Sequence, residues 1–403
     1  MSTRSGRRGS VKKDASGRWA WVVDYGSGKG NKRRQKRERG FATKREAQAA
    51  LTKHLGDVAD GTYIEPSAMT LAEYVDAEWL PIAAMRLRPS TLHSYSRNLR
   101  IHVLPKLGGV RLQELTGGQL TRLYLGLLAD GLADNSKRRD GLTGLSVRTV
   151  CYIHTIVHSV LKSAVNDDLL ASNAADKAEP PRQSSVADGT TPMRTWTATQ
   201  LKTFLAGERH TREYPLWVLL ATTGMRRGEA LGLGWEHLDL DAGTVRIVRT
   251  LVDVVDARDD EPVWSSPKTE AGRRTIKLDP PTVGVLRTHK TAQAKERLLV
   301  GPGYRDLGLV FNQPDGRAYH PERVSRTFQA RAKRAGLPQI RLHDLRHSWA
   351  TLALAAGIPA KIVQDRLGHA NVAITLNVYS HVSPQMQSDA ADRVAALIFG
   401  GTS

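Results

Sequence analysis

The sequence predicts a multidomain protein that is mainly α-helical and carries small β-sheets. A chain of 403 residues is long enough for two or three domains. The spacing of apolar residues alternates like a strand near residue 20 and becomes helical beyond residue 69, and a stretch rich in proline and serine interrupts it at 176–196. We therefore expect a three-stranded sheet plus helix, then a helical domain, then a mixed α+β domain.

The first domain is predicted over residues 1–65. The stretch SGRWAWVVDYG alternates as a strand does, with Trp19, Trp21 and Val23 on one face. A glycine-containing turn and a second, basic strand follow in GSGKGNKRRQKRERGFAT. Thr43 is expected to cap a helix. The apolar residues of that helix recur at helical spacing: Ala47, Ala50, Leu51, Leu55 and Val58.

A helical domain is predicted over residues 69–175. Its first part reads as two amphipathic helices, the second capped by Ser90 after Pro89. Two more helices are expected in LTGGQLTRLYLGLLADGL and SVRTVCYIHTIVHSVLKSAVNDDLL. Residues 176–196 have the composition of a linker. Residues 197–403 are then expected to be mostly helical, with strands at TVRIVRTLVD and RRTIKL.

The charge of the chain points to a polyanionic partner. Lysine and arginine exceed aspartate and glutamate by 59 − 40 = 19, and residues 1–50 alone carry 15 basic against 4 acidic side chains. DNA or RNA is the first partner to expect of such a surface. A basic tail that only aids solubility or adheres to anionic lipid is the alternative.

Particular basic residues are candidates for DNA contact. Those of the first domain lie where its sheet could face phosphates or bases: Arg33, Arg34, Lys36 and Arg37. Those of the helical domain lie on or beside its second helix: Arg88, Arg97 and Arg100. Each of the latter could equally belong to a solvated helix face.

The sequence also excludes some classes of protein. Cys151 is the only cysteine, so the chain holds no internal disulfide framework. The N-terminus MSTRSGRRGS lacks the apolar core of a signal peptide, and no apolar run is long enough to span a membrane. We expect a soluble cytoplasmic protein.

The stretch HDLRHSWATLALAAG, residues 343–357, raises the question of a metal site. Two histidines four residues apart on a helix can hold zinc, but here Arg346 lies between them and no glutamate follows His343. At about 100° per residue, Leu345, Trp349, Leu352 and Ala356 form the expected buried stripe. His343 and Arg346 then share the opposite face, which suits a phosphate. Two solvated surface histidines are the alternative.

Four further segments carry candidate site residues. In ATTGMRRGEALG, Arg226 and Glu229 are three residues apart at the start of a helix, where the carboxylate could hold the arginine. In SSPKTEAGRRTIKL, Lys268 lies at a turn before a strand, and QDRLGHANVAITLNVYSH supplies His369 and Tyr379. Taken singly, each has an ordinary structural explanation: a surface ion pair, a hairpin charge or a packed aromatic ring.

Taken together and in this order, these segments resemble the tyrosine recombinase (phage integrase) family. The family pattern is matched by TGMRRGE, PKTEAGRR, HDLRH, LGHANVAIT and VYSH. The resemblance is strong over 197–385. Residues 69–175 are similar to the family's helical core-binding (SAM-like) domain, and residues 10–60 look like the arm-type DNA-binding domain of long phage integrases.

The resemblance implies a reaction and a set of roles. Tyr379 would attack a DNA phosphate and retain it as a 3′-phosphotyrosyl ester, which permits rejoining without ATP. Charge on the phosphate oxygens would be met by Arg226 and Arg346, with His343 relaying a proton. Lys268 would protonate the leaving 5′ oxygen and His369 would add a hydrogen bond. Glu229 and His347 would support the site, and neither a metal nor a cofactor is expected.

The resemblance also implies partners. These are double-stranded DNA at attachment sites, a homotetramer on synapsed DNA, and possible host DNA-bending and excisionase proteins, in the bacterial cytoplasm at the nucleoid. The amphipathic C-terminal segment ADRVAALIFGG would dock on a neighbouring protomer or on its own domain. Two alternatives stay open at this stage: a type IB topoisomerase with the same chemistry, and a non-catalytic DNA-binding regulator on this scaffold.

Overall fold

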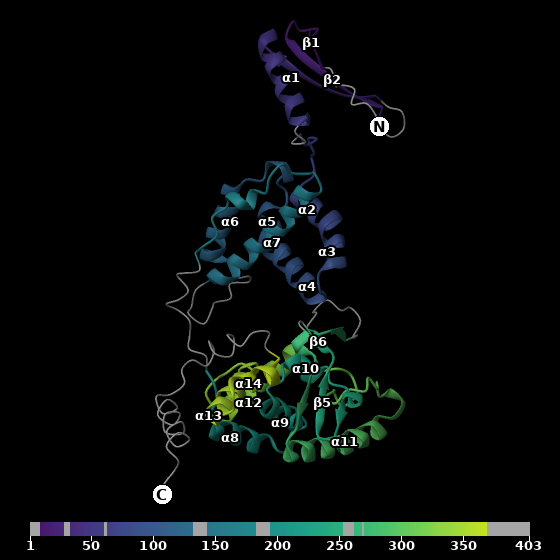
Figure 1. The fold of residues 1–403 in the computed structure, drawn as a ribbon, viewed down its shortest axis with the longest axis vertical. Coiled ribbons are helices and arrows are strands. Elements are labelled where there is room, and N and C mark those ends of the chain that lie inside the picture. The colour runs from purple at the N-terminus through teal and green to yellow at the C-terminus, as the bar shows by residue number, and fades with distance from the viewer. Residues whose placement is uncertain are drawn as a thin grey trace, which may run out of the picture. The chain divides into compact units, whose positions relative to one another are not determined.

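The structure of the chain, a computed structural model, divides into two compact units. One comprises residues 1–86 and 94–188, and the other residues 87–93 and 189–403. The structure describes residues 9–27, 33–59, 63–131, 143–182, 194–252, 262–267 and 270–368. Figure 1 shows the elements.

The N-terminal residues form the predicted sheet and helix. The elements are β1 (Gly9–Lys13), β2 (Trp19–Ser27), β3 (Arg33–Phe41) and α1 (Lys44–Ala59). The three strands are antiparallel in the order β1-β2-β3, and α1 packs on β1 and β2. Trp21, Val23 and Leu51 are buried between sheet and helix. The Thr43 hydroxyl accepts the backbone N–H of Glu46 at 3.2 Å, which confirms the predicted cap.

The helical domain contains the expected helices and lies in the first unit, except for residues 87–93, which include the start of one helix and belong to the second unit. Its α-helices are α2 (Leu71–Tyr74), α3 (Leu80–Arg86), α4 (Pro89–Asn98), α5 (Leu104–Leu107), α6 (Gly117–Asp130) and α7 (Val147–Asn166). Two π-helical segments, Val75–Trp79 and Leu99–Val103, connect α2 to α3 and α4 to α5 without a break. Short 3-10 turns lie at Leu112–Glu114 and Ala174–Lys177.

The start of α4 differs from the prediction. The backbone N–H groups of Thr91 and Leu92 both donate to the carbonyl of Arg88, each at 2.9 Å. Pro89 is therefore the first helical residue, and Ser90 lies inside the first turn rather than capping it. Proline suits this position because its φ is preset and the N–H it lacks would have no partner there.

The second unit combines helices with two small sheets. Its helices are α8 (Ala198–Glu208), α9 (Tyr214–Thr223), α10 (Arg227–Leu231), α11 (Pro280–Val300), α12 (Pro321–Arg334), α13 (Asp344–Ala355) and α14 (Ala360–Leu367). Its strands are β4 (Leu238–Asp239), β5 (Thr244–Ile247), β6 (Thr250–Val252), β7 (Val263–Ser265) and β8 (Arg274–Lys277). The sheet orders are β4-β5-β8 and β6-β7, both antiparallel. The predicted strand TVRIVRTLVD thus divides between two sheets.

Helix α9 lies at the centre of the second unit. It contacts α8, α10, α11 and α13 (Figure 1). Trp217 and Leu219 are fully buried on different sides of it, as expected of a helix that is apolar all round. Trp196, the last residue of the predicted linker, is also buried in this core and donates its indole N–H to the Pro338 carbonyl at 2.9 Å. The linker therefore ends before this residue.

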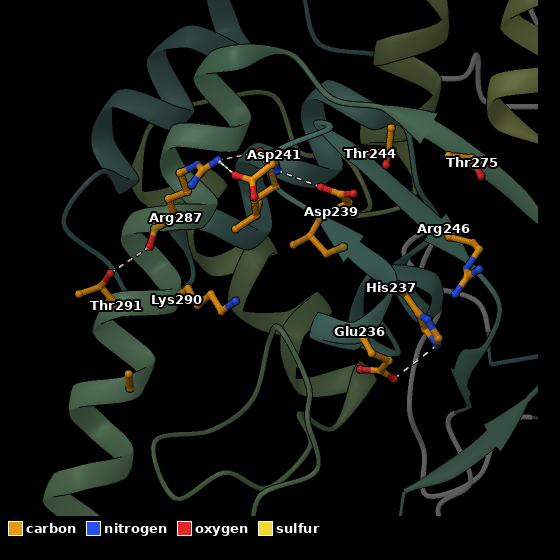
Figure 2. Close-up of a pocket in the computed structure, with 13 residues that line it drawn as sticks. Glu236, His237, Asp239, Asp241, Thr244, Arg246, Thr275, Arg287, Lys290 and Thr291 are labelled. Atoms are coloured by element: carbon orange, nitrogen blue, oxygen red, sulfur yellow. Dashed lines mark hydrogen bonds and ion pairs between the residues drawn. The ribbon is translucent and has the colours of Figure 1, made fainter.

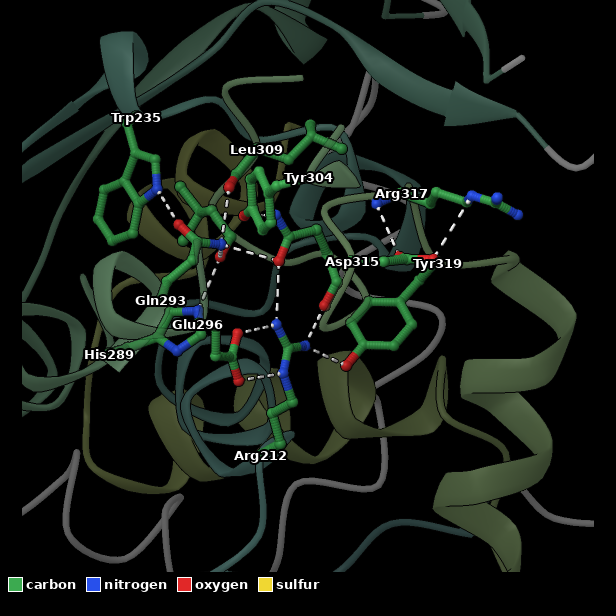
Figure 3. Close-up of polar contacts among 12 residues, drawn as sticks. Arg212, Trp235, His289, Gln293, Glu296, Tyr304, Leu309, Asp315, Arg317 and Tyr319 are labelled. Carbon is green, nitrogen blue, oxygen red and sulfur yellow. Dashed lines mark hydrogen bonds and ion pairs between the residues drawn. The ribbon is translucent and has the colours of Figure 1, made fainter. Parts of the chain in front are cut away.

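A buried polar network fixes the loop between α11 and α12. Arg212 binds Glu296 of α11 through two hydrogen bonds, of 2.8 and 2.6 Å. The same guanidinium donates to the Asn312 side chain at 3.0 Å and to the Tyr319 hydroxyl at 2.7 Å (Figure 3). These bonds satisfy the charge of Arg212 away from the predicted site.

A membrane-spanning helix needs about 20 consecutive, mainly apolar residues. No helix within the described part of the chain combines such length with such apolar character.

Candidate active site

The turn between α9 and α10 brings the chain close to the end of α14. Gly224 ends α9 with φ 65°. A Cβ at this position would lie 2.6 Å from the Leu367 side chain, so a glycine is required for both backbone conformation and space. Arg226 follows in an extended conformation immediately before α10. The turn therefore places Arg226 beside the C-terminal end of α14.

Glu229 holds Arg226 as the sequence predicts. Its carboxylate accepts the Arg226 backbone N–H at 3.0 Å and the Arg226 guanidinium at 2.7 Å. The Glu229 side chain is 2% exposed, whereas that of Arg226 is 39% exposed. One buried carboxylate thus fixes both the backbone and the side chain of an arginine that remains accessible to solvent.

Arg274 on β8 is a second partner of Glu229 that the sequence prediction missed. Its guanidinium donates to the two carboxylate oxygens at 3.2 and 3.0 Å, and its side chain is 8% exposed. The GRR segment is predicted to start a strand and to match the family pattern, without a partner for Arg274. Two adjacent arginines leading into a strand beside a candidate site could have suggested an internal ion pair.

The environment of Glu229 keeps its carboxylate ionised. Burial acts to raise its pKa, but hydrogen bonding and the charge of Arg274, together with the charge of Arg226, outweigh burial, so the pKa is lowered. Two guanidinium groups around one carboxylate leave this side of the site with a net positive charge, which suits an anionic ligand.

Arg346 is buried, at 2% exposure, and bridges two backbone carbonyls. It donates to Gly224 at 2.9 Å and to Leu367 at 2.7 Å. The prediction that Arg346 lies on an open face of its helix, opposite the buried stripe, is therefore wrong.

The reason is that α13 is covered on two sides. Leu345 belongs to the main core, while Ala350 and Ala353 pack against Val363 and Leu367. Ala356 of the predicted apolar stripe is exposed instead.

His343 and His347 lie beside Arg346 at the start of α13. Their rings meet edge to face, with centroids 5.1 Å apart. The pKa of His343 is lowered to about 4, first by desolvation and then by the neighbouring His347 and Arg346, although solvent still reaches the residue. Desolvation also lowers the pKa of His347. Both rings are therefore neutral at pH 7 in the unliganded protein.

The end of α14 is where the arginines meet. The carbonyls of three consecutive residues, Arg366, Leu367 and Gly368, each accept a hydrogen bond from a different arginine: Arg274 at 2.6 Å, Arg346 at 2.7 Å and Arg226 at 3.2 Å. The last carbonyls of a helix lack helical partners and form its negative pole. The structure thus brings the two sequence-predicted arginines, from α10 and α13, to adjacent peptide groups.

The remaining sequence-predicted site residues lie outside the described residues. These are Lys268, His369 and Tyr379, together with the C-terminal segment that includes Val394 and Leu397. In the described part of the chain, histidine, cysteine and carboxylate side chains do not form a group of three that could hold a metal ion.

The face of the N-terminal sheet opposite α1 carries exposed basic residues. Arg37 pairs with Val22 and Arg39 with Ala20, and these positions alternate with the helix-facing Trp21. Arg37 therefore lies on the open face as predicted, and Arg39, which the prediction omitted, joins it.

The prediction that Lys36 faces DNA with Arg37 is wrong, because Lys36 lies on the α1 side of the sheet. It pairs with buried Val23 and donates to the Tyr63 hydroxyl at 3.0 Å, with its ammonium 4.4 Å from the Tyr63 ring centroid. Arg33 and Arg34 are in β3, but their side chains lie outside the described ones.

The basic candidates of the helical domain are at least partly open to solvent. Arg88 is partly exposed and Arg97 is exposed on α4. Arg100 forms an exposed ion pair with Asp76 at 3.4 Å.

A large groove in the second unit lies away from these residues. It has a volume of about 980 Å³ and is bounded by α11 and the β4-β5-β8 sheet (Figure 2). Its charges are in part paired internally, as in Arg287–Asp241 at 2.5 Å. None of the sequence-predicted site residues lines it. We therefore place the candidate site at the arginine cluster, which is formed by Arg226, Arg274 and Arg346 around the end of α14.

Comparison with protein families assigns all three parts of the chain. Residues 195–386 match the phage integrase family. Residues 10–58 match an arm DNA-binding domain, and residues 70–128 match the N-terminal SAM-like domain of phage integrases.

Individual relatives agree with these matches. The chain is 26% identical over 370 residues to a tyrosine recombinase XerC-like protein of Caldanaerobacter subterraneus, covering 88% of this chain and 90% of that protein. It is 27% identical over 387 residues to an integrase of Streptomyces ambofaciens, covering 93% and 92%. Its fold is similar to that of the Tn1549 transposon integrase in complex with a circular intermediate DNA, with a TM-score of 0.62, 20% identity, and coverage of 81% of this chain and 100% of that one.

Proposed function

The chain belongs to the phage integrase family of tyrosine recombinases, and we propose that it cuts and rejoins DNA at attachment sites through a 3′-phosphotyrosyl intermediate on Tyr379. A tyrosine ester conserves the energy of the broken phosphodiester bond. The cut strand can then be joined to a new 5′ hydroxyl without ATP. This chemistry is what integration of a mobile element, such as a phage genome, requires.

The observation that supports this proposal most directly is the convergence of Arg226 and Arg346 on consecutive carbonyls. Arg226 donates to Gly368 at 3.2 Å and Arg346 to Leu367 at 2.7 Å. We propose that Arg226, whose side chain is 39% exposed, binds a phosphate oxygen directly. A guanidinium has five N–H donors, so the contacts of Arg346 with the Gly224 and Leu367 carbonyls do not preclude a further bond from this buried group to the phosphate once DNA is bound. Losing one such preorganised donor costs about 3–4 kcal/mol of transition-state stabilisation.

The histidines fit proton transfer in this site. His343 is neutral at pH 7 because its pKa is lowered to about 4, so one ring nitrogen can accept a proton and the other can donate one. We assign His343 a role in relaying the proton of the attacking Tyr379, whose intrinsic pKa is about 10. In the same proposal Lys268 protonates the leaving 5′ oxygen and His369 binds the phosphate, while Glu229 and His347 support these residues.

We also propose that the reaction needs no metal ion. Arg226, Arg346 and Lys268 would supply the positive charge that Mg²⁺ provides in many phosphoryl-transfer enzymes. Arginine stays charged at any pH of interest and matches phosphate geometry. Full cleavage in the presence of a chelator is therefore expected.

The assembly that we propose follows the family. DNA would be held by an arm-type domain over residues 1–65, a core-binding domain over 69–175 and a catalytic domain that begins at the buried Trp196 and extends to residue 403, with the linker ending before Trp196. Four copies would act on synapsed attachment sites at the host nucleoid, with DNA-bending and excisionase proteins as accessory partners. Affinity for DNA should fall steeply with salt, because binding releases counterions from many phosphates.

The test is formation of a covalent protein–DNA adduct on a nicked, labelled attachment-site duplex, read on a denaturing gel. The wild-type chain is expected to form the adduct with or without EDTA. Tyr379→Phe removes only the hydroxyl, so it should retain DNA affinity and form none. An adduct that persists in this variant overturns the assignment of Tyr379, and one that disappears with EDTA overturns metal independence.

A further inference from the structure

Arg274 contacts three separate parts of the arginine cluster. Its guanidinium binds both carboxylate oxygens of Glu229, and its Nε donates to the carbonyl of Arg366 at 2.6 Å. A further bond of 3.2 Å to the Gly272 carbonyl fixes the side chain against the 3-10 turn Glu270–Gly272, which precedes β8. With 8% of its side chain exposed, Arg274 has little access to a ligand in solvent.

We propose that Arg274 is a positioning residue of the recombination site, which acts by setting the orientation and the effective charge of Arg226 through Glu229. The proposal rests on the function proposed above.

Arg274 fixes the position of the Glu229 carboxylate, which in turn holds Arg226. Glu229 accepts four hydrogen bonds, two from Arg226 and two from Arg274. Without Arg274 the carboxylate would be held from one side only and could rotate. The Arg226 guanidinium would then lose the fixed direction in which it meets a phosphate, and small misplacements of such groups are costly to rate.

Arg274 also changes the net charge around Arg226. An ionised Glu229 in a buried position attracts the Arg226 guanidinium at 2.7 Å and opposes its attraction to a phosphate. Arg274 offsets that negative charge at 3.0 Å. The three side chains together carry one net positive charge, whereas Arg226 and Glu229 alone would carry none. Arg274 therefore keeps the site attractive to an anion.

Arg274 also contacts the C-terminal end of α14. Arg274 binds the Arg366 carbonyl, and the next two carbonyls are bound by Arg346 and Arg226. A Cβ at Gly368 would lie 2.6 Å from the Ala271 carbonyl and 3.0 Å from the Arg274 guanidinium. The chain is thus packed directly on Arg274 where it leaves α14.

The experiment measures adduct formation by the full chain in single turnover at saturating protein, alongside DNA affinity and thermal unfolding. Arg274→Gln is expected to lower the rate constant about a hundred-fold, and Arg274→Lys, which keeps the charge, about ten-fold. DNA affinity should change less than about three-fold in both, because phosphate contacts elsewhere dominate binding. A defect confined to affinity or to melting temperature would overturn the proposal.

Arg212→Gln is the matched control, because Arg212 makes a comparable two-bond contact with Glu296 in the same unit and away from the site. It should lower the melting temperature without changing the rate constant by more than about two-fold. Glu229→Gln combined with Arg274→Gln should be no slower than the slower single variant, since both act through one contact. Effects that multiply would contradict this.

The proposed function and this inference can fail separately. A wild-type chain that forms no adduct overturns both. A wild-type chain that forms the adduct while Arg274→Gln matches its rate constant overturns only the role of Arg274.

Discussion

Glu229→Gln should destabilise the second unit out of proportion to the size of the change. The substitution keeps the shape of the side chain and removes one negative charge. It replaces one oxygen by an NH₂ group, which would face an arginine donor whichever way the amide is turned, because both carboxylate oxygens accept from guanidinium groups. Arg274, with a side chain 8% exposed, would then be a buried cation without a counterion.

The expected cost follows from the burial of the partners. Removing one member of a buried ion pair costs about 3–5 kcal/mol. The Arg226 side chain is 39% exposed, so solvent compensates part of its loss, while Arg274 is not compensated. The lower end, about 3 kcal/mol, is therefore the expected loss of unfolding free energy. For a unit of roughly 200 residues this corresponds to a melting temperature about 6–12 °C lower.

The assay is thermal unfolding of the full chain by circular dichroism, with Glu322→Gln as the control. Glu322 lies 3.8 Å from Arg227 and 3.4 Å from Arg326, and its side chain is 48% exposed. Exposed pairs contribute at most about 1 kcal/mol, so the control should melt within about 4 °C of wild type. Equal melting of the two variants would refute the view that Glu229 anchors a buried network.

Two further predictions concern the open face of the N-terminal sheet and His343. Arg37→Gln and Arg39→Gln should each reduce the slope of log affinity for the arm site against log salt concentration by about one. Lys36→Met should leave that slope unchanged, because Lys36 faces Tyr63. An equal change of slope in all three variants, measured by fluorescence anisotropy, would contradict the assignment of Arg37 and Arg39 to the open face. The folded pKa of His343, about 4, lies below its ordinary value of 6.5, so its contribution to stability is complete above pH 6.5 and is lost as the pH falls towards 4. Between pH 6.5 and 4, the unfolding free energy measured by urea titration should therefore fall less in His343→Gln than in wild type. An NMR signal assigned to His343 that titrates near pH 6.5 would overturn the reasoning.

The sequence was most informative where local chemistry decides the structure. Trp21 and Val23 alternate along a strand, and Thr43 precedes a helix, so the elements of the N-terminal module and its buried face could be predicted, although the side of the sheet on which Lys36 lies could not. Ser90 shows the limit of such patterns. A serine and a proline at a helix start can exchange roles, and only the hydrogen bonds to the Arg88 carbonyl decide between them.

The candidate site could be predicted in its residues but not in its surroundings. The contact between Arg226 and Glu229 spans three positions and follows from helical spacing. The contact of Glu229 with Arg274 spans 45 positions, and no local periodicity reports it. The orientation of Arg346 was wrong because the prediction assumed one buried face for α13, whereas α14 covers a second one.

The contacts of Arg346 with backbone carbonyls explain why an arginine rather than a lysine suits this position. Arg346 spans from the Gly224 carbonyl to the Leu367 carbonyl with its two terminal nitrogens, which a single ammonium could not do with the same fixed geometry. One planar group thereby joins the end of α9 to the end of α14, and these ends carry Arg226 and the Gly368 carbonyl that it binds. A lysine at 346 would keep the charge and lose this connection. The site therefore depends on the shape of its cations as much as on their charge, because the planar guanidinium of Arg346 couples α9, α13 and α14 into one cluster.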